Sequence, residues 1–284
     1  MNGTMHEKTC LVTGGTSGIG YEIALGLARQ GARVVIVGRN SEKNATAARA
    51  ISDQSGNERV EFLTADLASQ ASTRDLAATI GATYDRLDVV VNNAGGIFSK
   101  RQVTVDGLEM TFALDHLAYF LLTNLLLPVL KESAPARVVN TSSGAHSRGH
   151  IWFDDLQSGR KYGAWKAYGR AKLANILFTY ELARRMAGTG VTSNCFHPGF
   201  VATNFAQNNG GLMALAVRLG HPFAVKVKDG AKTGIYLTSS PEVDRITGQY
   251  FVKEKPTRSS AESYDQVVAA LLWEVSAKLT GLGA

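Results

Sequence analysis

The stretch TGGTSGIG, residues Thr13–Gly20, follows directly on the apolar run Cys10–Val12. Glycines suit a strand-to-helix turn at which a pyrophosphate approaches backbone N–H groups at the positive end of a helix. The spacing Gly-x-x-x-Gly-x-Gly has a longer first gap than the commoner dinucleotide fingerprint, so an ordinary glycine-rich turn is the alternative. We predict a phosphate-binding turn whose cofactor contacts come from Gly14, Thr16, Ser17, Gly18, Ile19 and Gly20.

Short β-branched runs alternate with segments of helical periodicity along the whole chain, which is the pattern of βαβ units on a parallel sheet. The chain therefore belongs to the α/β class, with a doubly wound Rossmann sheet flanked by helices. Residues near 142–164 and 200–229 are irregular and follow strand ends, where open sheets bind ligands, so they are candidate substrate-covering loops. Seven strands are predicted, at Thr9–Thr13, Arg33–Val37, Val60–Thr64, Val89–Val91, Arg137–Asn140, Val191–Phe196 and Gln249–Val252.

Length and composition fit one globular domain over residues 1–284, with 45% hydrophobic residues and no linker or repeat. The net charge of +6 comes from scattered basic residues, so a phosphate-bearing cofactor suffices as anionic partner and nucleic acid is not expected. Cys10 and Cys195 lack metal or disulfide spacing, so we expect buried thiols and no metal. Met1–Lys8 hold no apolar stretch of signal or anchor length, which favours a cytoplasmic protein without a membrane anchor.

The end of the second predicted strand indicates which dinucleotide would bind. An acidic residue there would accept hydrogen bonds from the adenosine ribose hydroxyls, but this chain has Gly38 followed by Arg39. A guanidinium suits a 2′-phosphate, and Asn40 and Lys43 stand nearby. These residues favour NADP(H) over NAD(H), with a solvated surface arginine as the alternative.

Tyr168 and Lys172 are four residues apart within Ala164–Ala187, whose apolar spacing predicts a long helix, so they share one helix face. A phenol with a pKa of about 10 is a poor acid or base at neutral pH, and a nearby ammonium lowers that pKa by stabilising the phenolate. We therefore expect Lys172 to lower the pKa of Tyr168, which then exchanges a proton with a carbonyl or alcohol oxygen.

The order of these motifs resembles the short-chain dehydrogenase/reductase family over essentially the whole chain. The resemblance rests on Thr13–Gly20, Asp66, Asn92–Gly95, the Ser143 region, Tyr168 with Lys172, and Pro198 with Gly199. It implies that Ser143 binds the substrate oxygen, whereas Ser142 caps the backbone locally, and that Lys172 also reaches the nicotinamide ribose. It further implies cofactor contacts by Asp66, Leu67, Asn93, Ala94, Gly95, Pro198, Gly199, Val201 and Thr203. Asp66 as a simple helix N-cap is compatible with its role at the adenine ring.

Position 115 departs from the family pattern. Members commonly carry an asparagine that helps to hold a water linking the lysine to solvent, and this chain has Asp115 instead. A carboxylate accepts hydrogen bonds and attracts Lys172, but it donates only when protonated. We expect the proton relay to survive with an altered pH dependence, and we expect His116 to be a packed helix residue rather than a catalyst.

Within the family, Asn140–His146, Tyr168–Arg185 and Ile235–Val252 resemble the retinol dehydrogenase-like branch, which acts on retinoids, lipid aldehydes and related hydrophobic carbonyls. The resemblance implies an NADP(H)-dependent oxidoreductase that interconverts a carbonyl and an alcohol. A catalytically impaired, cofactor-binding regulator is the alternative that Asp115 raises. An apolar or aromatic substrate is favoured by the loop residues Trp152, Phe153, Tyr162, Trp165, Phe200, Phe205, Leu212 and Met213. Each of these side chains equally suits the core or an oligomer contact.

Family members usually assemble as dimers or tetramers through their fourth and fifth helices, so the resemblance implies a homodimer or homotetramer. The apolar run Phe120–Leu130 suits such a contact, and it equally suits the core.

Overall fold

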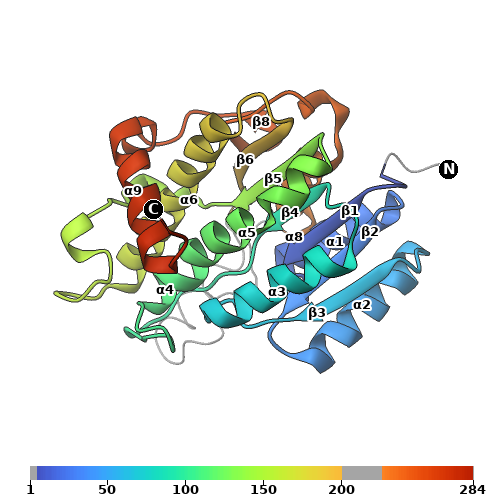
Figure 1. Cartoon of the computed structure of the whole chain (residues 1–284), viewed down its shortest axis with the longest axis horizontal. Coiled ribbons are helices and arrows are strands. Elements are labelled where there is room, and N and C mark those ends of the chain that lie inside the picture. The colour runs from blue at the N-terminus through green and yellow to red at the C-terminus, as the bar shows by residue number, and fades with distance from the viewer. Residues whose placement is uncertain (1–4, 200–225, 284) are drawn as a thin grey trace.

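Eight strands form a single sheet in the computed structural model, which describes residues 5–199 and 226–283 (Figure 1). Their order is β3-β2-β1-β4-β5-β6-β7-β8, in which neighbours from β3 to β7 are parallel and β8 is antiparallel to β7. The strands are β1 (Thr9–Thr13), β2 (Arg33–Gly38), β3 (Val60–Thr64), β4 (Val89–Asn92), β5 (Ala136–Thr141), β6 (Val191–His197), β7 (Gln249–Val252) and β8 (Lys255–Pro256).

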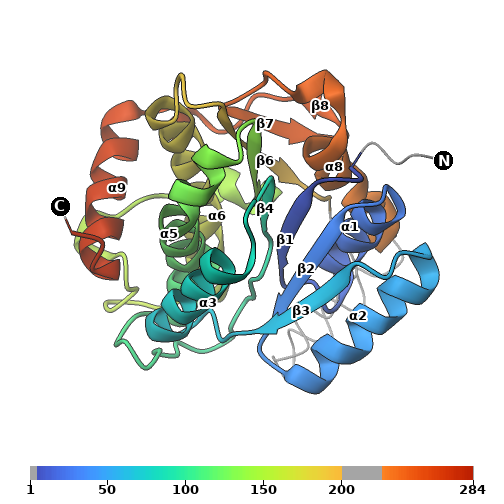
Figure 2. The same ribbon diagram turned by 45° about the vertical axis from the view of Figure 1, so that its right-hand side comes forward.

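Helices cover both faces of the sheet (Figure 2). On one face α1 (Gly18–Arg29), α2 (Ser41–Ser55) and α8 (Val227–Ser239) pack on the sheet, and on the other lie α3 (Gln70–Thr83), α5 (Ala118–Glu132) and α6 (Ala164–Arg185). Within the described residues, the other helical segments are α4 (Met110–Phe112), the π-helical η1 (Ala113–Leu117), α9 (Gln266–Thr280), and the 3₁₀ turns η2 (Gly144–Arg148), η3 (Phe153–Asp155), η6 (Pro241–Val243) and η7 (Ala261–Tyr264).

The seven predicted strands are confirmed, each end within one residue. Short apolar runs are typical of parallel strands covered on both faces, although the edge strand β3 is only partly buried. The two-residue β8 has no such pattern and was not predicted. The predicted helix over Ala164–Ala187 is confirmed as α6, which ends at Arg185. Residues 142–164 contain η2 and η3, and most of the second candidate loop lies outside the described residues.

The strand order changes direction beside β1 and β4, since β2 and β3 follow on one side and β5 to β7 on the other. Ligands of open α/β sheets bind beyond the carboxyl ends of the strands at this point. Thr13 ends β1 and Asn92 ends β4, so the predicted glycine turn and the segment Asn93–Gly95 both begin at this crevice.

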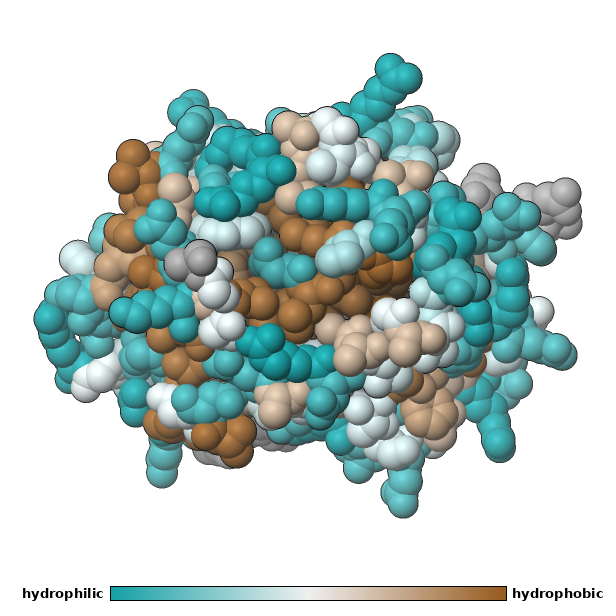
Figure 3. Space-filling view, viewed as in Figure 1, coloured by the Kyte–Doolittle hydropathy of each residue, from teal (hydrophilic) through white to brown (hydrophobic). Residues whose placement is uncertain are grey.

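The apolar segment Met110–Glu132, which includes η1 and α5, is long and apolar enough to cross a membrane by length and composition. However, 67% of its most apolar window is buried inside the protein, as expected of a core helix. Phe120, Leu126 and Leu130 are buried, whereas Leu127 and Val129 are partly exposed. Apolar residues also gather in the middle of the face seen in Figure 3, within a mostly polar surface. The buried side chains of the run Phe120–Leu130 therefore belong to the core. Self-association through the partly exposed side chains of the run stays a prediction.

Candidate active site

The glycine turn after β1 is closely packed against the segment that follows β4. Gly14 has a φ of +64°, and a Cβ on it would lie 2.9 Å from the Cα of Ala94. A Cβ on Gly20 would lie 2.4 Å from the carbonyl oxygen of Gly14. The turn and the first turn of α1 therefore require glycine at both positions, because a side chain at either would push them apart.

The start of α1 is suited to an anion. Its N-cap, Ser17, makes no side-chain capping hydrogen bond, and its first turn has no acidic residue. Gly18 begins the helix with a φ of +60°. The first N–H groups of a helix lack intrahelical partners and carry a partial positive charge, so Thr16 to Gly20 fit a pyrophosphate here.

The predicted cofactor residues after β2 take two different positions. Arg39 is exposed at the carboxyl end of the strand. The Oδ1 of Asn40 accepts a hydrogen bond from the Lys43 N–H at 2.9 Å, which makes Asn40 the N-cap of α2. Arg39 is thus the side chain free to meet a 2′-phosphate, whereas Asn40 is committed to the helix.

Asp66 is exposed after β3, and its Oδ1 accepts from the Ala68 N–H at 3.0 Å. It is not a helix N-cap, because Ser69 caps α3. The next residue, Leu67, has a buried side chain, so its backbone is the part available to an adenine ring.

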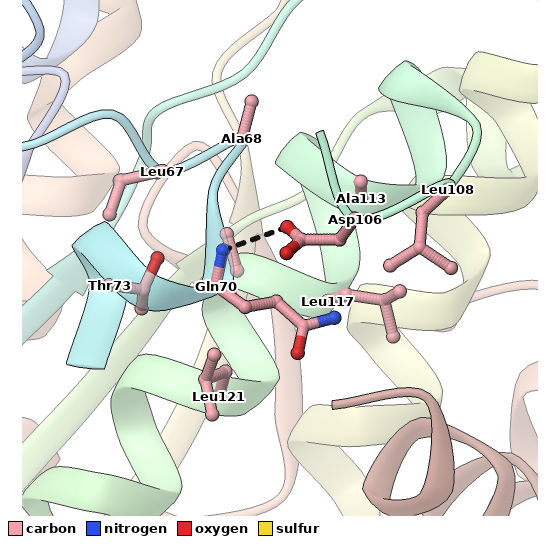
Figure 4. Close-up of a pocket in the computed structure, with 10 residues that line it drawn as sticks. Leu67, Ala68, Gln70, Thr73, Asp106, Leu108, Ala113, Leu117 and Leu121 are labelled. Carbon is pink, nitrogen blue, oxygen red and sulfur yellow. Dashed lines mark hydrogen bonds between the residues drawn. The ribbon is translucent and has the colours of Figure 1, made fainter. Parts of the chain in front are cut away.

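Figure 4 shows Leu67 in the wall of a small crevice beside the start of α3, where Asp106 accepts from the Gln70 N–H at 2.9 Å. Ser143, Tyr168 and Lys172 are not in that wall.

The segment after β4 is fixed by hydrogen bonds to β1. The Thr13 Oγ1 accepts from the N–H groups of Asn93 at 2.9 Å and Ala94 at 3.1 Å, and the Asn93 Nδ2 donates to the Thr13 carbonyl at 3.1 Å. Gly95 lies against Asp115, since a Cβ on it would be 3.0 Å from the carboxylate. The predicted residues Asn93 to Gly95 therefore connect the glycine turn to the catalytic region.

Ser143 and Tyr168 are brought together as predicted. Ser143 follows β5, Tyr168 lies in the second turn of α6, and the two side chains share a hydrogen bond that favours the phenolate. The Ser143 Oγ also accepts from the Ala145 N–H at 3.2 Å. The expectation that Ser142 is a local cap was wrong, because its Oγ donates to the Lys172 carbonyl at 2.9 Å and so attaches β5 to α6.

Lys172 forms a buried ion pair with Asp115. The Nζ of Lys172 lies 3.1 Å from the Oδ2 of Asp115, and the other carboxylate oxygen accepts from the Gly96 N–H at 2.7 Å. The ammonium lies 5.3 Å from the centre of the Tyr168 ring and 5.5 Å from that of Tyr119. Burial raises the pKa of Asp115, while Lys172 and the Gly96 N–H oppose that rise.

The pKa of Tyr168 is raised, which corrects the expectation that Lys172 lowers it. Burial disfavours the phenolate most, the negative charge of Asp115 adds to this effect, and the Ser143 hydrogen bond opposes it. Since the charge of Lys172 is paired with Asp115, it does not dominate the environment of the phenol. Tyr168 is therefore a protonated phenol at neutral pH.

His116 is a packed helix residue, as expected. It is fully buried, with Nδ1 3.3 Å from the Asn175 Oδ1 and Nε2 3.0 Å from the Ser276 Oγ. Asn175 was not singled out from the sequence, although its Nδ2 donates to the Asp115 carbonyl at 2.8 Å. Asn175 lies three residues after Lys172, on the helix face that Tyr168 and Lys172 share, and this spacing was the signal for it.

Pro198 and Gly199 follow β6 at the same edge of the sheet, whereas Val201 and Thr203 lie outside the described residues, as do Phe200, Phe205, Leu212 and Met213. Trp152 is 56% exposed in the loop after β5. Trp165, expected in a covering loop, instead lies in the first turn of α6, where it is 57% exposed. The Trp165 ring meets that of Tyr168 edge-on at 6.2 Å, so an aromatic surface borders the candidate catalytic tyrosine.

Comparison with known proteins agrees with this geometry. Residues 8–211 match the family model described as short chain dehydrogenase. The chain is 43% identical to retinol dehydrogenase 13 of Homo sapiens, over 99% of this chain and 87% of that protein. It is 42% identical to retinol dehydrogenase 12 of Mus musculus, over 97% and 87%.

Among solved structures, an uncharacterized protein from Mycobacterium paratuberculosis has a TM-score of 0.80 and 33% identity, covering 99% of this chain and 96% of that one. The Pseudomonas aeruginosa RhlG/NADP active-site complex has a TM-score of 0.71 and 29% identity, covering 88% and 96%. The family model and the near-full-length relatives lead to one assignment: this chain belongs to the short-chain dehydrogenase family and resembles the retinol dehydrogenases within it.

Proposed function

We propose that this oxidoreductase uses NADP(H) to interconvert a carbonyl and an alcohol on an apolar or aromatic small molecule. The observation that carries the proposal is the hydrogen-bonded pair of Ser143 and Tyr168, with Lys172 beside the phenol, at the same sheet edge as the glycine turn. The exposed ring of Trp165 beside Tyr168 supports an apolar or aromatic substrate.

The residues divide the chemistry as follows. When bound, the nicotinamide supplies or accepts the hydride. The Ser143 hydroxyl orients the substrate oxygen, and the Tyr168 hydroxyl donates a proton to that oxygen during reduction or accepts one during oxidation. Because its raised pKa keeps Tyr168 protonated at neutral pH, the site is prepared for reduction, and oxidation is favoured as the pH rises.

Cofactor binding would use residues that fit it. The uncapped start of α1 and the tight glycine turn would hold the pyrophosphate, and exposed Arg39 would meet the 2′-phosphate. The similar solved structure of the RhlG/NADP complex also supports a preference for NADP(H).

The test is oxidation of NADPH and NADH against a panel of aromatic, retinoid, steroid and quinone carbonyls. Tyr168→Phe removes the proton donor, so we expect kcat to fall by about 100-fold or more while NADPH still binds. Tyr21→Phe is the matched control, because its hydroxyl contacts Gln54 on the surface. Cofactor binding without turnover by the wild-type protein would favour the regulator, which the neutralising Asp115–Lys172 pair makes the second candidate.

A substitution at Arg39 tests the proposed preference for NADP(H) over NAD(H). Arg39→Ala should raise the KM for NADPH about tenfold or more, because hydrogen bonds to a charged group are worth about 1.5–3 kcal/mol, and it should leave the KM for NADH unchanged. Equal effects on both cofactors would show that Arg39 does not contact a 2′-phosphate.

A further inference from the structure

His197 joins the two loops that border the candidate catalytic serine. It is the last residue of β6, and its Nδ1 accepts hydrogen bonds from the Gly144 N–H at 3.1 Å and the Gly199 N–H at 3.3 Å. Gly144 directly follows Ser143, and Gly199 belongs to the turn after β6. One ring nitrogen thereby holds the Ser143 turn and the Pro198–Gly199 turn together.

A second imidazole holds the same turn from within it. The Nδ1 of His146 lies 2.6 Å from the carbonyl oxygen of Ser143, which only accepts, so Nδ1 donates. The Nε2 of His146 then accepts from the Ser260 N–H at 3.2 Å. This geometry requires opposite tautomers, with the proton on Nδ1 in His146 and on Nε2 in His197.

We propose that His197 and His146 are positioning residues that hold the Ser143 turn in its working geometry, and that they do so only as neutral imidazoles. A second proton on His197 would place an N–H against two backbone donors. A second proton on His146 would place an N–H against the Ser260 donor. Either event removes an acceptor on which the turn depends. The inference rests on the proposed role of Ser143.

The surroundings of the pair keep both rings neutral near neutral pH. Burial lowers the pKa of His197 and of His146, and a charge on His146 lowers that of His197 further. The strand residue paired with His197 on β7 is Val252, which does not titrate. Tyr250 meets the His146 ring at 5.0 Å, and burial raises its pKa, so it stays uncharged.

Two substitutions at His197 separate the hydrogen bond from the volume of the ring. The Oδ1 of asparagine takes the place of Nδ1, so His197→Asn should keep kcat for carbonyl reduction within about threefold of wild type. His197→Leu has similar bulk and no acceptor, so its kcat should fall about tenfold or more. Equal kcat values for the two folded variants, whether both high or both low, would overturn the proposal.

The pH profile gives a second kinetic readout. Because burial lowers the pKa of both rings, wild-type kcat should decline on the acidic side only at pH values below the ordinary histidine pKa of about 6.5. His197→Asn should lose part of that decline, because its amide does not titrate. Superimposable acidic profiles of wild type and His197→Asn would argue against control by His197.

The tautomers are tested without any turnover by ¹⁵N NMR of the histidine rings in the protein alone. At pH 7.5 we expect His197 to carry its proton on Nε2 and His146 on Nδ1, with His197→Leu and His146→Gln assigning the signals. A proton on Nδ1 of His197 would refute the proposal. The expected tautomers in a protein that reduces no carbonyl would refute the proposed function alone.

Discussion

At the scale of single residues, Asp115 sets the electrostatics of the site. A carboxylate 3.1 Å from the Lys172 ammonium, with both side chains buried, offsets the cost of burying either charge alone. The same negative charge adds to burial in raising the pKa of Tyr168. Asp115 thus acts on the proton donor at a distance, and the lysine that was expected to tune the phenol is largely neutralised.

Asp115→Asn removes this negative charge and keeps the size of the side chain. The pKa of Tyr168 should fall, because one of the two causes that raise it is lost. In alcohol oxidation Tyr168 must be the phenolate, so the rise of kcat/KM with pH should move to lower pH. The measurement is the pH dependence of kcat/KM, with exposed Asp75→Asn as the control. An unchanged profile would remove Asp115 from the groups that act on Tyr168.

Residue positions were predictable where a local spacing determined them. Tyr168 and Lys172 share a face because they are one helical turn apart, and Ser143 follows a strand that was recognisable from its β-branched residues. The contacts of Ser142 and His197 were not predictable, because their partners, Lys172 and Gly144, come from elements that only the folded sheet brings together. The rise in the pKa of Tyr168 was not predictable either, because it depends on how deeply the folded protein buries the phenol.

At the scale of elements, the π-helical turn η1 leaves no signature in the sequence, where Phe112, Asp115 and Tyr119 recur at ordinary helical spacing. Periodicity identifies a helix, but one extra residue in a turn leaves no mark on an apolar pattern. Within η1, the Asp115 carbonyl accepts from Asn175 of α6, and His116 reaches Ser276 of α9. The turn is thereby held by two other helices.

His116, which contacts both α6 and α9, should make the free energy of unfolding sensitive to acid. Burial lowers its pKa to about 4 from an ordinary value of 6.5. Above pH 6.5 neither state is protonated. Below it the unfolded chain takes up the proton first, so the free energy of unfolding falls by about 3 kcal/mol as the pH drops to about 4. Urea denaturation across this range should show a smaller loss for His116→Gln, and parallel curves would contradict the assignment.

At the scale of the whole molecule, α9 is the outermost layer over α5 and α6 (Figure 2). Its Trp273 meets Phe120 of α5 edge-on at 4.9 Å and stacks on Phe178 of α6 at 5.7 Å, while the Arg185 guanidinium lies 4.3 Å from the Trp273 ring centre. One aromatic side chain therefore connects the last helix to α5 and to α6, the helix that carries Tyr168 and Lys172.

Trp273→Ala should lower the free energy of unfolding by about 2–4 kcal/mol, because it removes a large aromatic side chain that is only partly exposed. Val267→Ala on the same helix is the control, since Val267 is 77% exposed and its truncation should change stability by about 0.5 kcal/mol or less. Both are measured by urea denaturation. Because Ser276 of α9 contacts His116, loosening the helix should also lower kcat. A destabilised variant with wild-type kcat would show that α9 supports the fold without reaching the active site.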